Sequence, residues 1–186
     1  MFSGLMFDPV WVIVLPAMAL AVYAQWKVHS TYTRYSEVRI GRRMTAHEAA
    51  QRILNAEYVD GVSIERIDRK LGDHYDPRKK ILRLSAPDAE SVAAIGVAAH
   101  EAGHAMQHAK NYAPLALRST LVPVANFGSQ LAFPLFLIGL FAQIPVLITA
   151  GIVLFSVAVL FTLVTLPVEF DARRRAVRAL EQTGMV

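Results

Sequence analysis

The residues best suited to chemistry in this sequence are His100-Glu101-Ala102-Gly103-His104, an HExxH motif within the alanine-rich run from 91 to 110. Residues four apart share one face of an α-helix, so both imidazoles can bind one metal ion while Glu101 lies beside them. A zinc ion bound in this way keeps an open position for water and lowers the pKa of that water toward about 7. The motif therefore predicts one Zn²⁺ ion bound by His100 and His104, with Glu101 as the catalytic base of a hydrolase, in the first place a peptidase.

The alternative is an ordinary buried helix in which the histidine spacing arose by chance. Small residues around the motif indicate a helix packed closely on several sides; they are Ala98, Ala99, Ala102, Gly103 and Ala105. Two imidazoles and a carboxylate buried there without a partner would be costly, and a bound metal removes that cost. We therefore favour the metal site, on a helix predicted to span 89–110 with Asp88 or Ser91 as its cap.

A zinc site with two histidines needs at least one further protein ligand, often a glutamate from a second helix. Glu169 is the first charged residue after a long uncharged stretch, so it is the best candidate. In the alternative, Glu169 pairs with Arg173 and Asp171 pairs with Arg175, as helix salt bridges four residues apart. Exposed pairs of that kind contribute little, whereas the metal needs a ligand, so Glu169 is the predicted third ligand.

Two short segments before the motif, 62–67 and 80–85, alternate apolar and polar residues as half-buried strands do. Turn-forming residues fill 72–77 between them, so we expect a hairpin or a small sheet. The second segment could be an edge strand that pairs with the substrate backbone, or a plain structural strand. The candidate residues of this edge strand are Ile81, Leu82, Arg83 and Leu84.

Three further side chains are secondary candidates. His74 and Tyr75 in the turn could stabilise an oxyanion, or they could merely close the turn. His108 continues the spacing of four, but successive steps of four drift around a helix, so we expect it to turn away from the metal.

The composition points to a membrane protein. Hydrophobic side chains make up 54% of the 186 residues and the mean hydropathy is +0.37, whereas soluble domains contain about 45–50% apolar residues. Residues 9–26 carry no charge and match a single spanning helix of about 20 residues. A cleaved signal peptide is the alternative. Residues 1–8 contain Asp8 and no Lys or Arg, so an uncleaved anchor over 1–26 is predicted.

A second apolar region, 119–168, contains no Asp, Glu, Lys, Arg or His. As one helix its 50 residues would be roughly 75 Å long, more than twice the ~30 Å hydrocarbon core, so two antiparallel spans are predicted. The turn is expected at 143–145, between helices over 121–142 and 146–166. Asn126 and Gln130 should face protein, because unsatisfied amides are costly in lipid.

Basic residues follow both apolar regions, in 27–43 and 173–178, and positive charge beside a span marks the cytoplasmic side. The predicted fold class is an α-helical integral membrane protein with about three transmembrane helices and a small α+β zincin-like cytoplasmic catalytic portion. Its parts are the anchor 1–26, the cytoplasmic region 27–118, the transmembrane hairpin 119–168 and a cytoplasmic third-ligand helix 169–186.

These features limit the function classes. Cysteine is absent, which excludes disulfides and thiolate ligands. Nucleic acid is not an expected partner, because there is no basic stripe with interleaved aromatics, and spans without charged residues do not indicate a channel or transporter. We expect a zinc metalloendopeptidase whose partners are the lipid bilayer and a peptide or membrane-protein substrate. The rival is a non-catalytic scaffold or adaptor in which zinc joins the motif helix to the last span.

Several separated motifs, in order, resemble the YugP-type neutral zinc metallopeptidases. They are the N-terminal apolar segment, Asp73 to Pro77, Lys80 to Ser85, Ala98 to Gln107 and Leu166 to Ala172, and they cover nearly the whole chain. Members of this family are bacterial membrane proteins related by motif to the membrane gluzincins, such as the heat-shock protease HtpX. The resemblance implies a multi-pass protein of the bacterial inner membrane, with the same three ligands and the same base, and it implies no particular substrate.

The sequence departs from that family in two places. Family members usually continue into a further apolar helix, whereas this sequence ends at Val186; a neighbouring molecule of a homo-oligomer could supply such a helix. Membrane gluzincins usually carry an acid four residues after the ligand glutamate, where this chain has Arg173. Asp171 is the candidate that orients a histidine ligand in its place.

Overall fold

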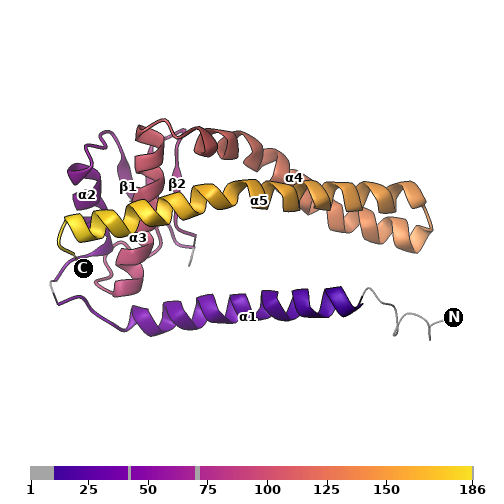
Figure 1. Cartoon of the computed structure of the whole chain (residues 1–186), viewed down its shortest axis with the longest axis horizontal. Helices are drawn as coiled ribbons and strands as arrows, with labels where there is room; N and C mark the ends of the chain where they lie inside the picture. The colour runs from indigo at the N-terminus through magenta and orange to yellow at the C-terminus, as the bar shows by residue number, and fades with distance from the viewer. Residues whose placement is uncertain (1–10, 42, 70–71, 186) are drawn as a thin grey trace.

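The computed structural model describes residues 11–41, 43–69 and 72–185. In this part of the chain the elements follow in the order α1 (Trp11–Ser36), α2 (Ala46–Ala56), β1 (Ser63–Arg66), β2 (His74–Asp76), β3 (Ile81–Leu84), α3 (Val92–Ala109), α4 (Ala113–Ala142) and α5 (Pro145–Gln182). α4 and α5 form a long antiparallel pair that extends to one end of the molecule (Figure 1). α2, the strands and the C-terminal part of α5 gather around α3 at the other end.

α3 is the centre of the folded portion. It begins after Ser91, whose hydroxyl accepts a hydrogen bond from the Ala94 amide, so Ser91 and not Asp88 is its cap. The helix is therefore slightly shorter than the predicted 89–110. α2, the sheet and α5 pack against it and bury its small residues, as the alanine-rich sequence predicted. The buried alanines of α3 are Ala94, Ala98, Ala99, Ala102 and Ala105.

α2 supplies an apolar layer beside α3. A capping box fixes its start, because the Glu48 amide donates to the Thr45 hydroxyl while the Thr45 amide donates to the Glu48 carboxylate. Farther along the helix, Ile53 is fully buried in the core that also contains Leu82 of β3. Burying a side chain of this size stabilises the fold by about 1.5–3 kcal/mol, so this layer anchors the sheet to the helices.

The strands form a three-stranded sheet in the order β1-β3-β2. β1 pairs with β3 in parallel and β2 pairs with β3 antiparallel, so a small sheet is present, but the hairpin joins β2 and β3. Of the two alternatives for 81–84, the edge strand is wrong, because β3 is the central strand and is paired on both sides. Residues 74–76, which the sequence placed in a turn, form the short strand that covers its second edge.

The turn between the two long helices lies where the sequence placed it. α4 ends at Ala142, Gln143 adopts a left-handed conformation with φ 58°, and Pro145 opens α5. The outer bounds of the hairpin differ from the prediction, because α4 already begins at Ala113 and α5 runs through Pro167 to Gln182. The predicted third-ligand helix 169–186 therefore continues the long apolar helix, and α5 links the apolar region to the site as one element.

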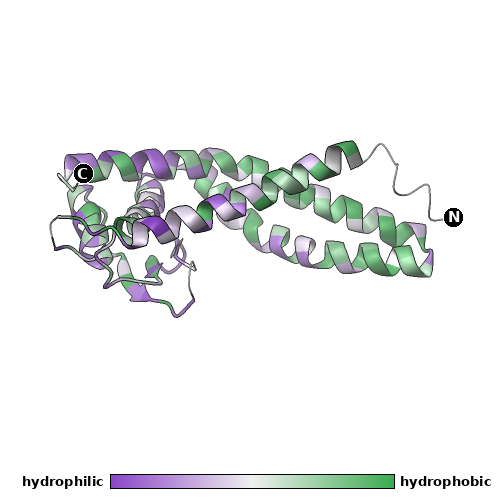
Figure 2. Ribbon diagram, turned by 90° about the horizontal axis from the view of Figure 1, so that it is seen from below, coloured by the Kyte–Doolittle hydropathy of each residue, from purple (hydrophilic) through white to green (hydrophobic). Residues whose placement is uncertain are grey.

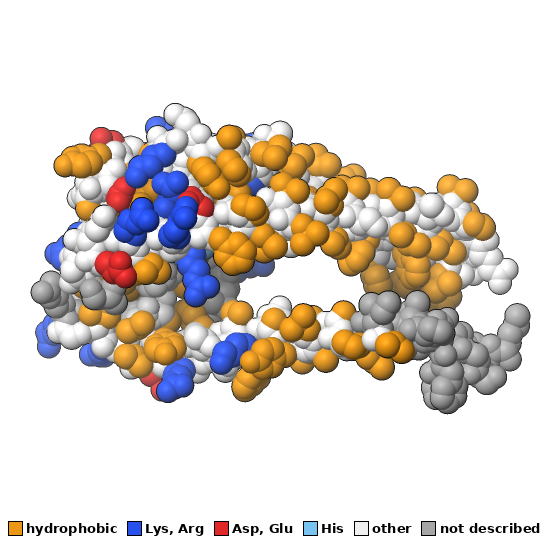
Figure 3. Space-filling view, in the orientation of Figure 1, with side chains coloured by type: hydrophobic (Ala, Val, Ile, Leu, Met, Phe, Trp, Pro, Cys, Tyr) orange, Lys and Arg blue, Asp and Glu red, His pale blue; other side chains and the backbone are white. Residues whose placement is uncertain are grey.

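α4 and α5 are each long and apolar enough to cross a membrane, and they are the two such helices among the described residues. Large side chains on their outer surface, such as Phe141 and Phe155, are 82% and 62% exposed. Hydrophobic residues cover this pair along its length, while charged residues gather around α3 and the end of α5 (Figures 2 and 3). Such a continuous apolar surface is suited to lipid.

α1 runs apart from the α4–α5 pair in Figure 1 and packs against α3. It extends past the predicted anchor, whose first ten residues lie outside the described part of the chain. The third transmembrane helix therefore stays a prediction.

Asn126 and Gln130 differ from the expectation, because both side chains are exposed on α4. The face of α4 that packs on α5 carries small residues instead: Ala125, Gly128, Ala132 and Gly139. A Cβ on Gly139 would lie 2.6 Å from the Ile148 backbone nitrogen of α5. Helices that approach this closely leave no room for an amide side chain between them.

Candidate metal centre

The three predicted ligands converge between α3 and α5. His100 and His104 project from one face of α3, and Glu169 reaches them from α5, which crosses α3 (Figure 1). Glu169 Oε2 lies 3.1 Å from His100 Nε2 and 3.6 Å from His104 Nε2. One ligand atom from each residue lies within 4.8 Å of the others. The fold thus brings the third candidate from a distant segment onto the motif.

This donor set fits zinc. Zinc bonds to imidazole nitrogen and carboxylate oxygen are about 2.0–2.2 Å long, so two ligand atoms on one tetrahedral ion lie roughly 3.3 Å apart. The two distances from Glu169 to the histidines lie on either side of that value. His104 is buried, whereas His100 and Glu169 are half-buried, so a metal ion bound here would keep one side open to an adjacent cleft.

Glu101 lies beside the ligands and is 8% exposed. Burial raises the pKa of its carboxyl group, while His104, His100 and a hydrogen bond from the Tyr75 backbone amide act in the opposite direction. The hydrogen bond to Glu169 raises the pKa of His100, and burial opposes that rise. A buried carboxylate with a raised pKa is a stronger base than an exposed one, which suits proton abstraction.

A cleft of about 410 Å³ opens beside these residues. β2 and the turn after it form one wall, and the first turns of α4 form another, with Leu115 and Val122 on its surface. β2 is paired with β3 along one edge, and Tyr75 of β2 lines the cleft together with Glu101. The other edge of β2 has no strand partner among the described residues, and β2 forms part of the cleft that also contains the glutamate of the motif.

The comparison with known proteins agrees with this geometry. Residues 10–186 match the family described as "Putative neutral zinc metallopeptidase". The chain belongs to this family. A curated relative from Bacillus subtilis strain 168, "Putative membrane protease YugP", is 43% identical over 176 residues, which cover 94% of this chain and 78% of the relative. No solved structure matches the chain. The family that the motifs indicated is thereby confirmed.

The side chains of His74 and Tyr75 are engaged within the wall of the cleft. His74 Nδ1 donates to the Gly72 carbonyl at 2.7 Å, which leaves Nε2 to accept from Arg83 at 3.2 Å. The Tyr75 hydroxyl bonds to His108 Nδ1 at 2.9 Å, and burial together with the charge of Asp76 raises the pKa of Tyr75 to about 12. His108 thus bonds to β2 instead of joining the metal group, and the Tyr75 contact links β2 to α3, whereas the His74–Gly72 bond lies within the turn. An oxyanion role for either side chain stays a prediction.

Arg118 of α4 is a residue beside the candidate site that the sequence did not predict. Its guanidinium lies 2.5 Å from Glu169 Oε1, whereas Oε2 of the same carboxylate faces the histidines. Arg118 thus occupies Oε1 of Glu169 and leaves Oε2 as the oxygen that could bind a metal. Arg118 is the last charged residue before the uncharged stretch, and that position was the available signal.

The alternative salt bridges are formed only in part among the described residues. Asp171 accepts hydrogen bonds from Arg175 at 2.5 Å and from Arg174 at 2.8 Å. Glu169 pairs with Arg118 instead of Arg173, which is exposed on α5. Asp171 does not touch a histidine directly; its carboxylate bonds to Gln107, which in turn bonds to His104.

Proposed function

We propose that this member of the zinc metallopeptidase family is a one-zinc endopeptidase of the gluzincin type, which hydrolyses peptide bonds at the cytoplasmic surface of the membrane. The observation that carries the proposal is the convergence of His100, His104 and Glu169 next to buried Glu101, on a cleft with an open strand edge. A zinc ion held by these ligands would supply Lewis-acid activation of the scissile carbonyl and of the attacking water.

Glu101 performs the proton transfers in this proposal. Its carboxylate accepts a proton from the attacking water as the water oxygen bonds to the carbonyl carbon. The same group then delivers that proton to the leaving nitrogen as the C–N bond breaks, so the products are a free carboxyl group and a free amine. Water and peptide balance the reaction, and Glu101 returns to its starting state.

The open edge of β2 supports an extended peptide as the substrate. A peptide added to this edge would be held by backbone hydrogen bonds, which tolerate many sequences. It would lie along the wall of the cleft that contains Tyr75, and Glu101 lines the same cleft. β2 thereby takes the position that the sequence analysis assigned to 81–84.

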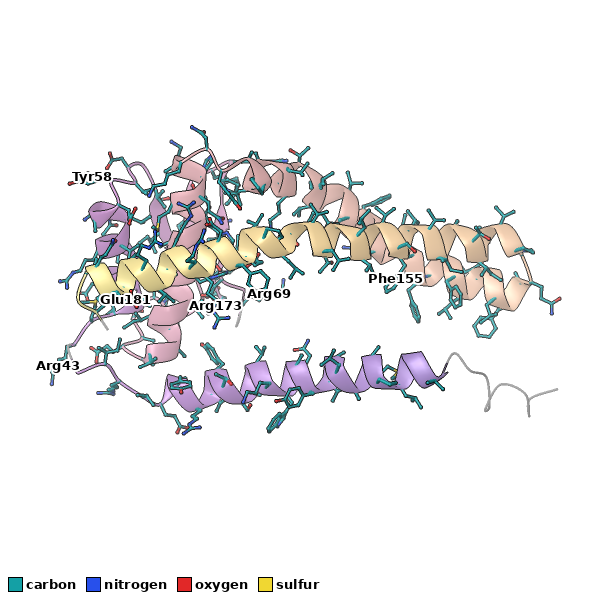
Figure 4. All side chains as sticks on the ribbon, in the orientation of Figure 1. Arg43, Tyr58, Arg69, Phe155, Arg173 and Glu181 are labelled. Atoms are coloured by element: carbon teal, nitrogen blue, oxygen red, sulfur yellow. The ribbon has the colours of Figure 1, made fainter. Side chains whose placement is uncertain are left out.

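The charge distribution supports a cytoplasmic site. Arg173, Arg174 and Arg178 are exposed on α5 just beyond its apolar half, where a basic cluster is visible at the end of the helix (Figures 3 and 4). Positive charge next to a span favours the cytoplasmic side. Glu169 lies between the apolar half and this cluster, which would hold the metal centre at the membrane surface.

Purified Glu101→Gln protein tests the proposal. We expect the variant to retain zinc while kcat for a casein-derived peptide falls about 10²–10⁴-fold, because the base is lost and the ligands are intact. His100→Ala should lose both zinc and turnover. Cleavage by Glu101→Gln at the wild-type rate would contradict the assignment. Zinc-loaded wild-type protein that cleaves nothing and unfolds on chelation would favour the scaffold.

A further inference from the structure

Gln107 lies one turn after His104 on α3 and is fully buried between α3 and α5. Three hydrogen bonds engage its side-chain amide. Oε1 lies 3.0 Å from His104 Nδ1, and Nε2 donates to the Val168 carbonyl at 2.8 Å and to Asp171 Oδ2 at 2.9 Å. Gln107 is not among the residues that line the cleft, so it would not contact a peptide bound there.

The partners of Gln107 leave its amide only one orientation. The Val168 carbonyl can only accept a hydrogen bond, so it must face the NH₂ group of Gln107. A flipped amide would place two oxygens against each other in the interior, at the cost of two unsatisfied groups. Oε1 is therefore directed at His104, and because a carbonyl oxygen only accepts, His104 Nδ1 must carry the hydrogen.

That hydrogen decides which nitrogen of His104 can bind a metal. A neutral imidazole with hydrogen on Nδ1 carries its lone pair on Nε2, the atom 3.6 Å from Glu169 Oε2. We propose that Gln107 is a positioning residue that fixes the Nδ1–H tautomer of His104 and keeps Nε2 directed at the metal site. Asp171 takes part only through Gln107. This inference rests on the proposed metal site and adds a determinant of its affinity.

The same amide also ties one ligand helix to the other. Val168 and Asp171 flank Glu169 on α5, and both are bonded to a side chain that touches a ligand on α3. Rotation or sliding of α5 that moves Glu169 away would break these bonds. Gln107 thus couples the orientation of His104 to the placement of the third ligand.

The test compares three variants in the full chain. Gln107→Leu keeps the bulk and removes every hydrogen bond. Gln107→Glu combined with Asp171→Asn exchanges donor and acceptor across that bond while keeping an acceptor on His104. Thr165→Val is the matched control, because Thr165 is a buried polar residue of α5 that bonds within its own helix to Thr162. Circular dichroism establishes that each variant is folded.

Two readouts separate positioning from packing. Histidine ¹⁵N spectra of the metal-free protein, with the His104 signals assigned through His104→Ala, report which nitrogen carries the hydrogen. Competition with a chelator gives the dissociation constant for Zn²⁺. We expect Gln107→Leu to populate the Nε2–H tautomer and to lose zinc affinity about 10–100-fold, the size usual for a residue that orients a ligand. The paired variant restores an acceptor for His104 Nδ1 but leaves an oxygen facing the Val168 carbonyl, so it should return to the Nδ1–H tautomer and recover only part of the zinc affinity. Thr165→Val should match the wild type.

Each other outcome has a definite meaning. Folded Gln107→Leu with the wild-type tautomer and wild-type zinc affinity would overturn the role of Gln107. A folded paired variant that keeps the Nε2–H tautomer would show that an acceptor at residue 107 does not fix the tautomer of His104, and it would also overturn the proposal. Wild-type protein that binds no zinc would instead refute the metal site itself, and the tautomer readout would still report on Gln107.

Discussion

Gly103, in the middle of the motif, sets the distance between the two helices that carry the ligands. A Cβ added there would lie 2.5 Å from the backbone oxygen of Ala172 on α5. The contact is with backbone, which cannot move aside as a flexible side chain can. The absence of a side chain at this residue therefore allows α5 to come close enough for Glu169 to reach His100 and His104.

Gly103→Ala should move α5 away from α3. We expect a loss of about 1–3 kcal/mol in the free energy of unfolding, as for an overpacked core, and a weaker zinc site because Glu169 moves with α5. Thermal unfolding and zinc titration of the purified variant measure both effects.

Gly96→Ala is the control on the same helix. Its added methyl group would meet nothing within 4 Å, and alanine favours a helix by up to about 1 kcal/mol over glycine. This variant should be as stable as the wild type or more so, with unchanged zinc affinity. If Gly103→Ala behaved in the same way, close approach at this point would not be needed for the site.

Among the helices, strands and turns, those that depend on neighbouring residues in the sequence were predicted correctly. The motif helix and the turn at 143–145 follow from spacing and turn residues, and the structure confirms both. Glu169 was chosen as the first charge after an uncharged stretch, and it lies beside the two histidines; its role as a ligand stays a prediction. β2 escaped prediction because three residues are too short to show alternation. The central position of β3 in the sheet was not predicted, because it depends on a parallel pairing with β1 across a long connection.

The end of one helix and two side-chain contacts could not be predicted from the sequence. The second helix of the hairpin was predicted to end at 166, before the charged residues, yet α5 continues through Pro167 to Gln182 as one helix. The contact between Arg118 and Glu169 depends on how α4 and α5 pack, which no local pattern encodes. Gln107 was visible in the motif, but its role required knowing that Val168 and Asp171 lie beside it.

For the whole molecule, the α4–α5 pair divides the chain into an apolar half and a charged half. Figure 4 shows Phe155 projecting from the apolar half of α5, while Arg173 and Glu181 mark the charged half of the same helix. The site lies where the two halves meet, because Arg118 of α4 and Glu169 of α5 form an ion pair at the boundary between them. In the proposed function this boundary would lie at the membrane surface.

The pair Phe155→Arg and Phe170→Arg tests that placement. The two phenylalanines are similarly exposed, at 62% and 65%, but only Phe155 lies in the apolar half. Arginine at the centre of a span costs about 2.5–3.5 kcal/mol, so Phe155→Arg should lower the amount of protein that resists alkaline extraction from membranes. Phe170→Arg should be extracted like the wild type. Equal extraction of the two variants would contradict a membrane-buried α5.

The central claim is that Glu169 completes a zinc site with the two histidines. Its most direct test is the zinc content of purified Glu169→Gln, an isosteric change, beside Glu181→Gln, which alters an exposed acid on the same helix. We predict one zinc ion per chain in the wild type and in Glu181→Gln, and well below one in folded Glu169→Gln, because a neutral amide is a poor zinc ligand. A full complement of zinc in Glu169→Gln would contradict the account.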